Sequence, residues 1–351
     1  MNSYAGKWEQ RWHPLRQEWV VYSAHRNTRP WSGASAPQGE QKPPYDPTCY
    51  LCPGNPRAHG ERNPNYEGVF IFDNDFPVVG SQAPEVAPEV PGAHPKLFKR
   101  ARASGIARVV CYDPRHHVSL AQISINRVAQ VFLAWREQMR EFQSNPGINS
   151  VLIFENRGEI VGVSNPHPHC QIYATNFTFS LVERAMKAAQ EFEQNHSGNI
   201  FDEILHFELH SGERIIADYP GAFAFVPFFA RYAYEVMIFP KQRHATLITM
   251  SDDELFDLAR AFQETIRRYD LLFDMPFPYV MSILQAPVDQ ADYPGYHLHL
   301  LLQPPLRQPG LQKFLAGPEI GAGNFMADTI PEEKAREMQL VDLSLYKELD
   351  A

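Results

Sequence analysis

The feature that most constrains the fold of this chain is a weak internal repeat. The segment "VVCYDPRHHVSLAQIS" at 109–124 resembles "VMIFPKQRHATLITMS" at 236–251. In each copy a helix-patterned segment follows, then a strand-like run ("SVLIFEN" or "YVMSILQ"), then a histidine pair. This shared order predicts duplication of one α+β module, with two sheets joined or paired and helices on one face. Chance similarity between amphipathic segments is the alternative.

Two long segments carry apolar residues three and four positions apart, which is the spacing of amphipathic helices. They span about 124–143 and 251–273. The second begins at Ser251, and Glu254 follows at the spacing of a capping box. We therefore expect one long helix in each copy of the repeat.

The composition limits the kind of ligand that the chain can bind. The 351 residues carry a net charge of −9, without a basic tail or a charge block. This balance disfavours nonspecific attraction to nucleic acid or anionic lipid, so an anionic ligand needs a local cluster of basic residues.

The chain also carries signals of its cellular location. The most apolar stretch, "AFAFVPFFA" at 222–230, is too short to span a bilayer, so we expect a soluble, untargeted protein. Four cysteines are too few for a disulfide framework, so we expect the reducing cytoplasm.

The stretch "SNPHPHCQIY", which starts at Ser164, places two imidazoles close together. In a strand, residues two apart face the same side, so His167 and His169 should share one pocket while Pro168 faces away. A lone histidine is more often a packing or surface residue than a catalyst. Here the polar neighbours, among them Ser164 and Gln171, suit donation of hydrogen bonds to phosphate oxygens. A neutral imidazole is a competent nucleophile toward phosphorus when its other nitrogen is fixed by a hydrogen bond.

The stretch "CYLC", from Cys49 to Cys52, has the spacing of a zinc knuckle. A single CxxC on its own fits structural zinc, a redox pair or two buried thiols. The redox pair needs a thioredoxin-like strand and helix, whereas "DPTCYLCPGNPRAHGERNP" is rich in turn residues. The interpretation as a zinc site is therefore favoured over a redox pair. His116, His117 and His167 are candidates for the further ligands.

Five stretches carry a family resemblance: "HRNTRPW", "CYLCPGN", "RNPNYEGVFIFDNDFP", "SNPHPHCQIY" and "HLHLLLQPPLR". Together they resemble the galactose-1-phosphate uridylyltransferase family, a branch of the histidine triad superfamily, over nearly the whole chain. The resemblance implies an α+β fold of two histidine triad-like (HIT-like) modules, mainly an antiparallel sheet with helices packed on it. The halves would be 1–178, with the zinc knuckle and the HPH strand, and 179–351, with a sugar-phosphate-binding segment.

The same resemblance implies an activity and its mechanism. UMP would pass from UDP-glucose to galactose 1-phosphate in a ping-pong reaction, carried out by a homodimer whose sites are shared between subunits. His169 would attack the α-phosphorus and become uridylylated. Cys49, Cys52, His116 and His167 would hold one zinc ion, with His116 chosen by motif register. Four protein ligands leave such an ion no open position, so the zinc would be structural.

Further positions match residues with which the family binds its substrates. An acidic residue and an amide can read uracil and ribose, while Ser, Asn and Gln donate to phosphoryl oxygens. The implied set is Leu51, Phe72, Asn74, Asp75, Phe76 and Val109 for the uridine pocket; Asn156, Ser164 and Gln171 for the phosphates, with Arg26 and Arg29 nearby; and Lys313, Phe314 and Glu319 for the sugar phosphate.

The chain departs from the family at two places. Some members hold a second metal with a glutamate and three histidines. His297 and His299 match two of these ligands, but "SILQAP" supplies no third histidine and Glu183 is out of register. A filled second site is therefore not expected. In the sugar segment Pro318 replaces an aromatic residue, which leaves the identity of the hexose open.

Three other functions compete with the transferase. An adenylyltransferase or phosphorylase acting on ADP-sugars or dinucleotides would keep His169 and differ in the base pocket. A nucleotide-binding module without turnover would bind a UDP-sugar and form no covalent intermediate. A metal-dependent hydrolase is disfavoured, because four protein ligands leave zinc no free position for water.

Overall fold

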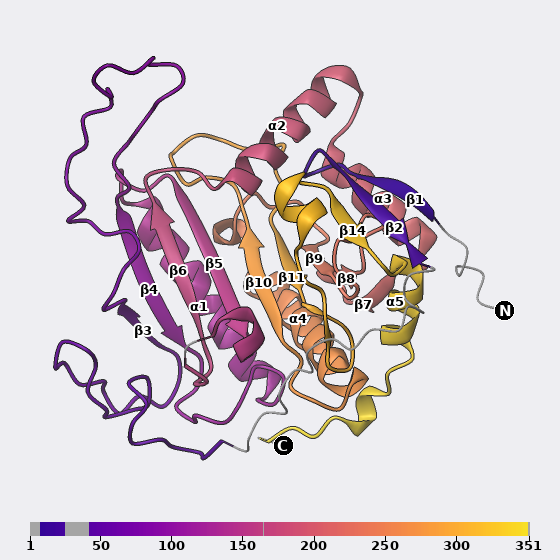
Figure 1. Ribbon diagram of the computed structural model, residues 1–351. Helices are drawn as coiled ribbons and strands as arrows, with labels where there is room; N and C mark the ends of the chain where they lie inside the picture. The colour runs from indigo at the N-terminus through magenta and orange to yellow at the C-terminus, as the bar shows by residue number, and fades with distance from the viewer. Residues whose placement is uncertain (1–7, 25–41, 164, 350–351) are drawn as a thin grey trace.

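One large antiparallel sheet organises the part of the chain that the computed structural model describes, residues 8–24, 42–163 and 165–349. Its nine strands lie in the order β3-β4-β6-β5-β10-β11-β9-β8-β7 (Figure 1). They span Phe70–Asp73 (β3), Gly105–Cys111 (β4), Ser150–Arg157 (β5), His169–Thr175 (β6), Ile215–Asp218 (β7), Ala222–Phe225 (β8), Val236–Pro240 (β9), Tyr279–Leu284 (β10) and His299–Gln303 (β11).

A three-stranded sheet brings the two ends of the chain together. β1 (Trp8–His13) pairs antiparallel with β2 (Glu18–Ser23), and β2 pairs in parallel with β14 (Phe325–Ala327). The hairpin of β12 (Leu306–Gln308) and β13 (Leu311–Gln312) precedes β14. Within residues 8–349, the first and last described strands therefore form one structural unit.

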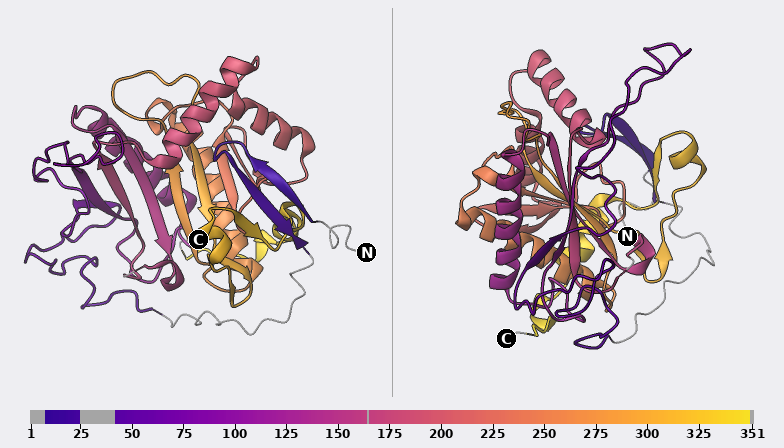
Figure 2. Two further views of the ribbon diagram at one scale, coloured as in Figure 1. Left: turned by 45° about the horizontal axis from the view of Figure 1, so that its top comes forward. Right: turned by 90° about the vertical axis from the view of Figure 1, so that its left-hand side faces the viewer.

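The helices lie on both faces of the large sheet. They span Ile125–Gln143 (α1), Ser180–Asn195 (α2), Ile200–Ser211 (α3), Asp252–Leu272 (α4) and Pro331–Gln339 (α5), with short turns at Glu159–Val161 (η2), Leu247–Thr249 (η3), Gly317–Gly321 (η4) and Leu343–Leu345 (η5). α1 and α4 pack on one face, whereas α2, α3 and the three-stranded sheet lie on the other (Figure 2). Among the described helices, none is both long and apolar enough to cross a membrane.

Strand alternation separates two hydrophobic cores. In β9 and β11, Ile238 and Leu300 belong to the core beneath α1 and α4, while Met237 and Leu301 belong to the core beneath α2 and α3. Successive side chains of a strand point to opposite faces, so a sheet covered on both sides reads as a continuous apolar run.

The order of the strands confirms the predicted duplication. The unit β4-α1-β5-β6 recurs as β9-α4-β10-β11, with β6 between β4 and β5 and β11 between β9 and β10. The two units meet where β5 pairs antiparallel with β10, so the sheet continues through both halves. α1 and α4 cover the same face, as the repeat predicts.

The two long helices occupy the predicted segments. The Ser251 hydroxyl accepts a bond from the backbone N–H of Glu254 (3.3 Å), whose carboxylate accepts from the backbone N–H of Ser251 (2.8 Å). This reciprocal pair is the predicted capping box of α4. α1 and α4 meet through buried rings such as Phe132 and Phe262, whose centroids lie 5.8 Å apart. Burial of each ring contributes roughly 1.5–3 kcal/mol, which fixes the helix layer on the sheet.

Candidate active site and metal centre

β6 alternates between core residues and polar residues. Cys170 and Ile172 are buried in the core beneath α1, so His169, Gln171 and Tyr173 point to the opposite face. Pairing with β4 on one side and β5 on the other fixes this register. The sheet therefore holds His169 at one end of a short row of polar side chains.

The backbone immediately before β6 orients His169. Its Nδ1 lies 2.8 Å from the carbonyl oxygen of His167. A carbonyl oxygen can only accept a hydrogen bond, so Nδ1 carries the proton and Nε2 keeps its lone pair. Burial lowers the pKa of His169, which favours the neutral ring. The arrangement provides an imidazole that can act as a nucleophile through Nε2.

The first histidine of the HPH motif lies outside the strand. β6 begins at His169, so His167 lies in the bend before it. The prediction that both imidazoles project from one strand is therefore wrong for His167, because Pro168 has no N–H with which to extend the ladder. Both histidines nevertheless line one cavity, as predicted.

His167 is directed toward the CxxC stretch. The sulfurs of Cys49 and Cys52 and a ring nitrogen from each of His116 and His167 all lie within 4.8 Å of one another, and all four residues are buried. Cys52 Sγ lies 3.6 Å from Nδ1 of each histidine. Two thiols and two imidazoles that converge in this way can hold a metal ion. The alternative ligand, His117, lines a neighbouring cavity instead.

Two neighbouring side chains contact two of these four ligands, His167 and Cys49. The Tyr66 hydroxyl donates to a backbone carbonyl oxygen of the CxxC stretch (2.6 Å), so it accepts from the Nε2–H of His167, 3.0 Å away. That bond leaves the Nδ1 lone pair of His167 facing the cluster. The Asn165 side chain lies 3.4 Å from Cys49 Sγ. Burial raises the pKa of the Cys52 thiol to about 11, so a thiolate there requires a cation beside it.

A cavity of about 510 Å³ opens beside His169. The structure brings together in its wall all six residues predicted for the uridine pocket: Leu51, Phe72, Asn74, Asp75, Phe76 and Val109. The guanidinium of Arg57 lies 4.4 Å from the centroid of the Phe72 ring and 3.9 Å from the Asp75 carboxylate. The cavity thus combines apolar walls with a few hydrogen-bonding groups, as small-molecule sites do.

A smaller cavity of about 30 Å³ lies between His169, Asn156, Gln171 and Gly162. Gly162 has a φ of +84°, a left-handed conformation that glycine adopts without strain. Asn74 donates to Oε1 of Gln171 (3.2 Å), so the amide N–H groups of Gln171 remain available as donors within the described structure. Two of the predicted phosphate contacts therefore lie beside the candidate nucleophile.

A third cavity, of about 660 Å³, also touches His169 and has charged walls. Arg157 and Asp270 form an ion pair there, with Nη2 and Oδ2 2.8 Å apart. Glu155 is buried and accepts a bond from the Tyr279 hydroxyl (3.1 Å). Burial raises the pKa of Glu155 to about 7, against an opposing effect of Arg157.

The residues predicted to bind the sugar phosphate lie elsewhere. Lys313 and Glu319 form an ion pair (Nζ to Oε1, 2.5 Å) in the loop between β13 and β14, which also carries Phe314. Figure 1 shows this loop in gold over the C-terminal half of the sheet. Within the described chain, the walls of the three cavities around His169 include none of these three residues. Arg26, Arg29 and Ser164 lie outside the described residues.

The second histidine pair is packed among aromatic rings. His299 Nδ1 lies 3.1 Å from the His297 carbonyl oxygen, and the Phe239 ring stacks on His299 at 4.8 Å. His297 Nε2 donates to the Pro240 carbonyl oxygen (3.1 Å). Within the described residues, the Cys2His2 cluster is the one convergent group of three or more candidate ligands, so the pair belongs to no such group. Glu183 lies in the first turn of α2.

Sequence reasoning missed several residues around the site. Tyr173 could have been found, because it continues the alternation of His169 and Gln171 along β6. Tyr66 lies in a stretch that carries the family resemblance, but no spacing in the sequence shows that it contacts a metal ligand. Arg57 lines the cavity of about 510 Å³, and nothing in the sequence distinguishes it from a surface arginine.

The duplicated fold, with a histidine at the head of β6 and a Cys2His2 cluster beside it, defines a duplicated α+β protein with a candidate nucleophile and a candidate metal centre. Comparison with family models is more specific. Residues 3–178 match the model described as galactose-1-phosphate uridyl transferase, N-terminal domain, and residues 185–350 match the corresponding C-terminal domain. The chain belongs to the galactose-1-phosphate uridylyltransferase family.

Individual relatives cover almost the whole chain. The galactose-1-phosphate uridylyltransferase of Haemophilus influenzae is 36% identical, over 96% of this chain and 95% of its own length. A solved uridylyltransferase structure matches with a TM-score of 0.76 at 29% identity, over 94% of this chain and 97% of that one. An ADP-glucose phosphorylase from Arabidopsis thaliana with bound ADP-glucose has a TM-score of 0.74 over 96% and 99% of the two chains. At 21% identity, the last likeness concerns the fold alone.

Proposed function

We propose that this protein transfers UMP from UDP-glucose to galactose 1-phosphate through a uridylyl-histidine intermediate on His169. The observation that carries the proposal is the position of that imidazole. Its Nδ1 is fixed by the His167 carbonyl oxygen at 2.8 Å, and the ring borders a cavity with all six predicted uridine residues. Family membership supports the same reaction, because the curated relative is named for it.

The chemistry requires two displacements at the α-phosphorus. In the first, His169 Nε2 forms a bond to the α-phosphorus, the bond from that phosphorus to the bridging oxygen breaks, and glucose 1-phosphate leaves. In the second, a phosphate oxygen of galactose 1-phosphate attacks the same phosphorus, UDP-galactose forms and the histidine is released. A sugar phosphate is a weakly basic leaving group, so little acid catalysis is needed. Asn156 and Gln171, which share a cavity with His169, would donate hydrogen bonds to the phosphoryl oxygens.

We further propose that the metal in the Cys2His2 cluster is zinc. Two cysteines and two histidines suit this ion, which supplies a rigid four-coordinate cross-link when bound. His167 would then be held on one side by the cluster and Tyr66, while its backbone oxygen orients His169. The cysteines must stay reduced to serve as ligands, which fits a cytoplasmic enzyme.

A homodimer would complete the site with the sugar-phosphate residues of the other subunit. Lys313, Phe314 and Glu319 lie outside the cavities around His169 of their own chain. The three-stranded sheet and η4, the elements around these residues, expose the apolar side chains of Trp8 and Ile320, each about three-quarters exposed. Exposed apolar groups of this kind suit an interface between protein chains.

An exchange assay tests the proposed reaction. The enzyme is incubated with UDP-glucose and labelled glucose 1-phosphate, without galactose 1-phosphate. A ping-pong enzyme incorporates label into UDP-glucose, because the first displacement runs in both directions without the acceptor. Absence of this exchange in an enzyme that still makes UDP-galactose would contradict the covalent mechanism. Exchange with ADP-glucose in place of UDP-glucose would shift the assignment to an adenylyltransferase.

A further inference from the structure

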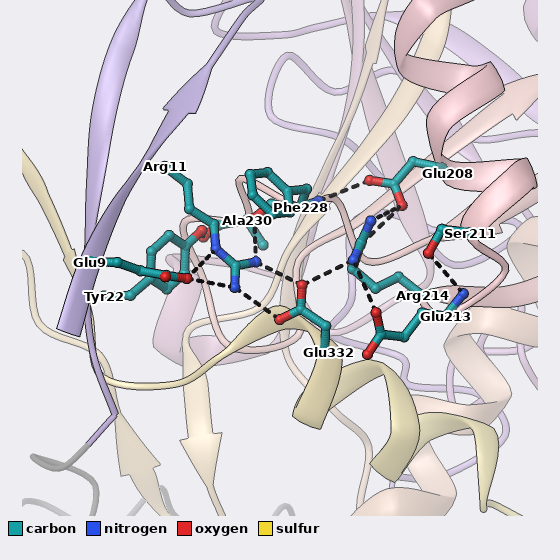
Figure 3. A network of polar contacts seen from close by, with 10 residues as sticks. All are labelled: Glu9, Arg11, Tyr22, Glu208, Ser211, Glu213, Arg214, Phe228, Ala230 and Glu332. Carbon is teal, nitrogen blue, oxygen red and sulfur yellow. Dashed lines mark hydrogen bonds and ion pairs between the residues drawn. The ribbon is translucent and has the colours of Figure 1, made fainter. Parts of the chain in front are cut away.

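A buried charge network joins the three-stranded sheet to the C-terminal half of the protein (Figure 3). Arg11 of β1 binds Glu332 of α5 with both terminal nitrogens, at 2.8 and 3.1 Å. Glu332 also accepts from Arg214, 2.9 Å away, and Arg214 in turn binds Glu208 of α3 at 3.0 Å. The side chains of all four residues are at most 5% exposed.

The network has further polar partners at its edges. Besides the two buried carboxylates, Glu9 binds Arg11 at 2.8 Å and Glu213 lies 3.7 Å from Arg214. The second oxygen of Glu208 accepts the backbone N–H of Phe228 at 2.9 Å. The Phe228 ring lies 4.2 Å from the Arg11 guanidinium carbon. Desolvation makes such networks poor sources of stability, since apolar replacements of similar volume are often as stable. The directional bonds of this network instead hold the elements that it joins, β1, α5 and α3, in one relative position.

The strand that the network holds is linked to the candidate sugar-phosphate residues. Arg11 lies opposite Val20 in the β1/β2 pair, and Val20 lies opposite Phe325 in the β2/β14 pair, so the three residues form one row. Lys313 Nζ lies 5.1 Å from the centroid of the Phe325 ring. Glu319 accepts the backbone N–H of the residue after Phe325, at 3.3 Å. Displacement of the row would therefore displace the Lys313–Glu319 pair.

We infer that the network of Arg11, Glu332, Arg214 and Glu208 is a positioning device for sugar-phosphate recognition. It fixes the β1-β2-β14 sheet, and this sheet carries Lys313 and Glu319 on the loop that enters β14. In the sequence, β2 leads directly toward Arg26 and Arg29, the candidate phosphate contacts. The inference rests on the proposed function, because it assumes that these residues bind the hexose phosphate. None of the four network residues lines the described cavities around His169.

The test uses the double variant Arg11→Met with Glu332→Leu, in the full-length protein. It removes one cation and one anion together and leaves Arg214 paired with Glu208. We expect the apparent KM for galactose 1-phosphate to rise about tenfold, because a small misplacement of binding groups is costly. The inhibition constant of UMP, which lacks the sugar phosphate, should stay within about twofold, since the uridine cavity lies in the other half.

The matched control is Arg136→Met, which removes another buried arginine. Arg136 of α1 binds the Met250 carbonyl oxygen and Asp252 in the helix layer, away from the three-stranded sheet. Arg136→Met should lower the melting temperature and leave the KM for galactose 1-phosphate and the inhibition constant of UMP unchanged. Should the double variant fail to fold, Arg11→Lys keeps the charge, loses the paired bonds and should raise the same KM by a smaller factor.

The outcomes separate the inference from the function on which it rests. A wild-type enzyme that transfers UMP, with an unchanged KM for galactose 1-phosphate in the folded variants, overturns the positioning role alone. An equal rise in the Arg136→Met control also overturns it, because the effect would then be general destabilisation. A wild-type enzyme without uridylyl transfer overturns the proposed function itself.

Discussion

The two halves of the molecule carry the same backbone arrangement around different chemistry. At the head of β6, His169 Nδ1 bonds to the carbonyl oxygen of His167 at 2.8 Å; at the head of β11, His299 Nδ1 bonds to that of His297 at 3.1 Å. The first pair borders cavities and the Cys2His2 cluster, whereas the second is at most 1% exposed among aromatic rings. Duplication thus preserves the orientation of an imidazole, and the surrounding segments decide whether a ligand can reach it.

Most of the segments that make this difference lie outside the repeated unit, and β9 alone belongs to it. In the N-terminal half, the CxxC loop and β3 surround His169 and leave room for a ligand beside it. In the C-terminal half, α3 and β9 place Phe201 and Phe239 against His299. A packed aromatic cage leaves no space for a nucleotide.

The largest expected effect contrasts the two equivalent histidines. His169→Gln should reduce uridylyl transfer by about 10⁴-fold or more, because the nucleophile is lost while the fold is kept. His299→Gln should leave the rate within about tenfold, since that ring is buried and lines none of the described cavities around His169. Initial-rate assays on both variants measure the contrast, with circular dichroism to establish folding. An equal loss of transfer rate in the two variants would contradict the assignment of the nucleophile to the N-terminal half alone.

The second contrast concerns the metal centre of the N-terminal half. Cys52→Ser should lower the metal content and reduce the free energy of unfolding by about 3–5 kcal/mol, because a cross-link between the CxxC loop and the HPH bend is lost. Cys170→Ala is the matched control, since this buried cysteine lies outside the cluster. Elemental analysis and denaturant titration give the two quantities. A full metal content in Cys52→Ser would exclude this residue as a ligand.

The third contrast is a buried carboxyl in the N-terminal half that has no counterpart at the equivalent position of the C-terminal half. When the two repeats are superposed by strand register, with His169 equivalent to His299, Ile283 of β10 is the residue equivalent to Glu155 of β5. The pKa of Glu155 is raised to about 7 from an ordinary value of 4.5, so the folded state favours the protonated carboxyl. Its contribution to stability is complete below pH 4.5 and lost as the pH rises through 7, a change of about 3 kcal/mol.

Glu155→Gln should therefore flatten the stability profile between pH 5 and pH 8, with the largest gain over wild type at the alkaline end. Denaturant unfolding at several pH values measures this effect. A variant whose stability follows pH as steeply as the wild type would show that Glu155 is ionised in the folded protein throughout.

The smallest expected effect tests the support of a metal ligand. Tyr66→Phe removes the acceptor for the His167 Nε2–H, and it should weaken metal binding about 10- to 100-fold without unfolding the protein. Competition with a chelator measures the change. Tyr173→Phe is the control, because that hydroxyl bonds to Gln171 and not to a cluster ligand. Unchanged metal affinity in Tyr66→Phe would mean that the cluster orients His167 without help.

The sequence predicts those parts of the fold that depend on local pattern. The period of apolar residues gives α1 and α4, the spacing of Ser251 and Glu254 gives the cap, and the repeat gives the duplicated order of elements. The bend at His167 differs from the prediction because Pro168 cannot donate a bond to β4, a signal that the sequence does carry. By contrast, no local pattern places the loop of Lys313 on the three-stranded sheet, since that depends on pairing between the two ends of the chain.

The site could be predicted as a set of residues but not as an arrangement. The cluster ligands Cys49, Cys52, His116 and His167 were expected together, and the structure brings them within 4.8 Å of one another. The orienting bonds of Tyr66 could not be predicted, because they join segments that are distant in sequence.

The most direct test of the central claim is the location of the covalent intermediate. The enzyme is treated with UDP-glucose without acceptor, digested at a pH that preserves phosphorus–nitrogen bonds, and mapped by tandem mass spectrometry. We predict a UMP adduct on His169, none on His299, and loss of the adduct when galactose 1-phosphate is added. An adduct on another residue, or transfer activity without any adduct, would contradict the account.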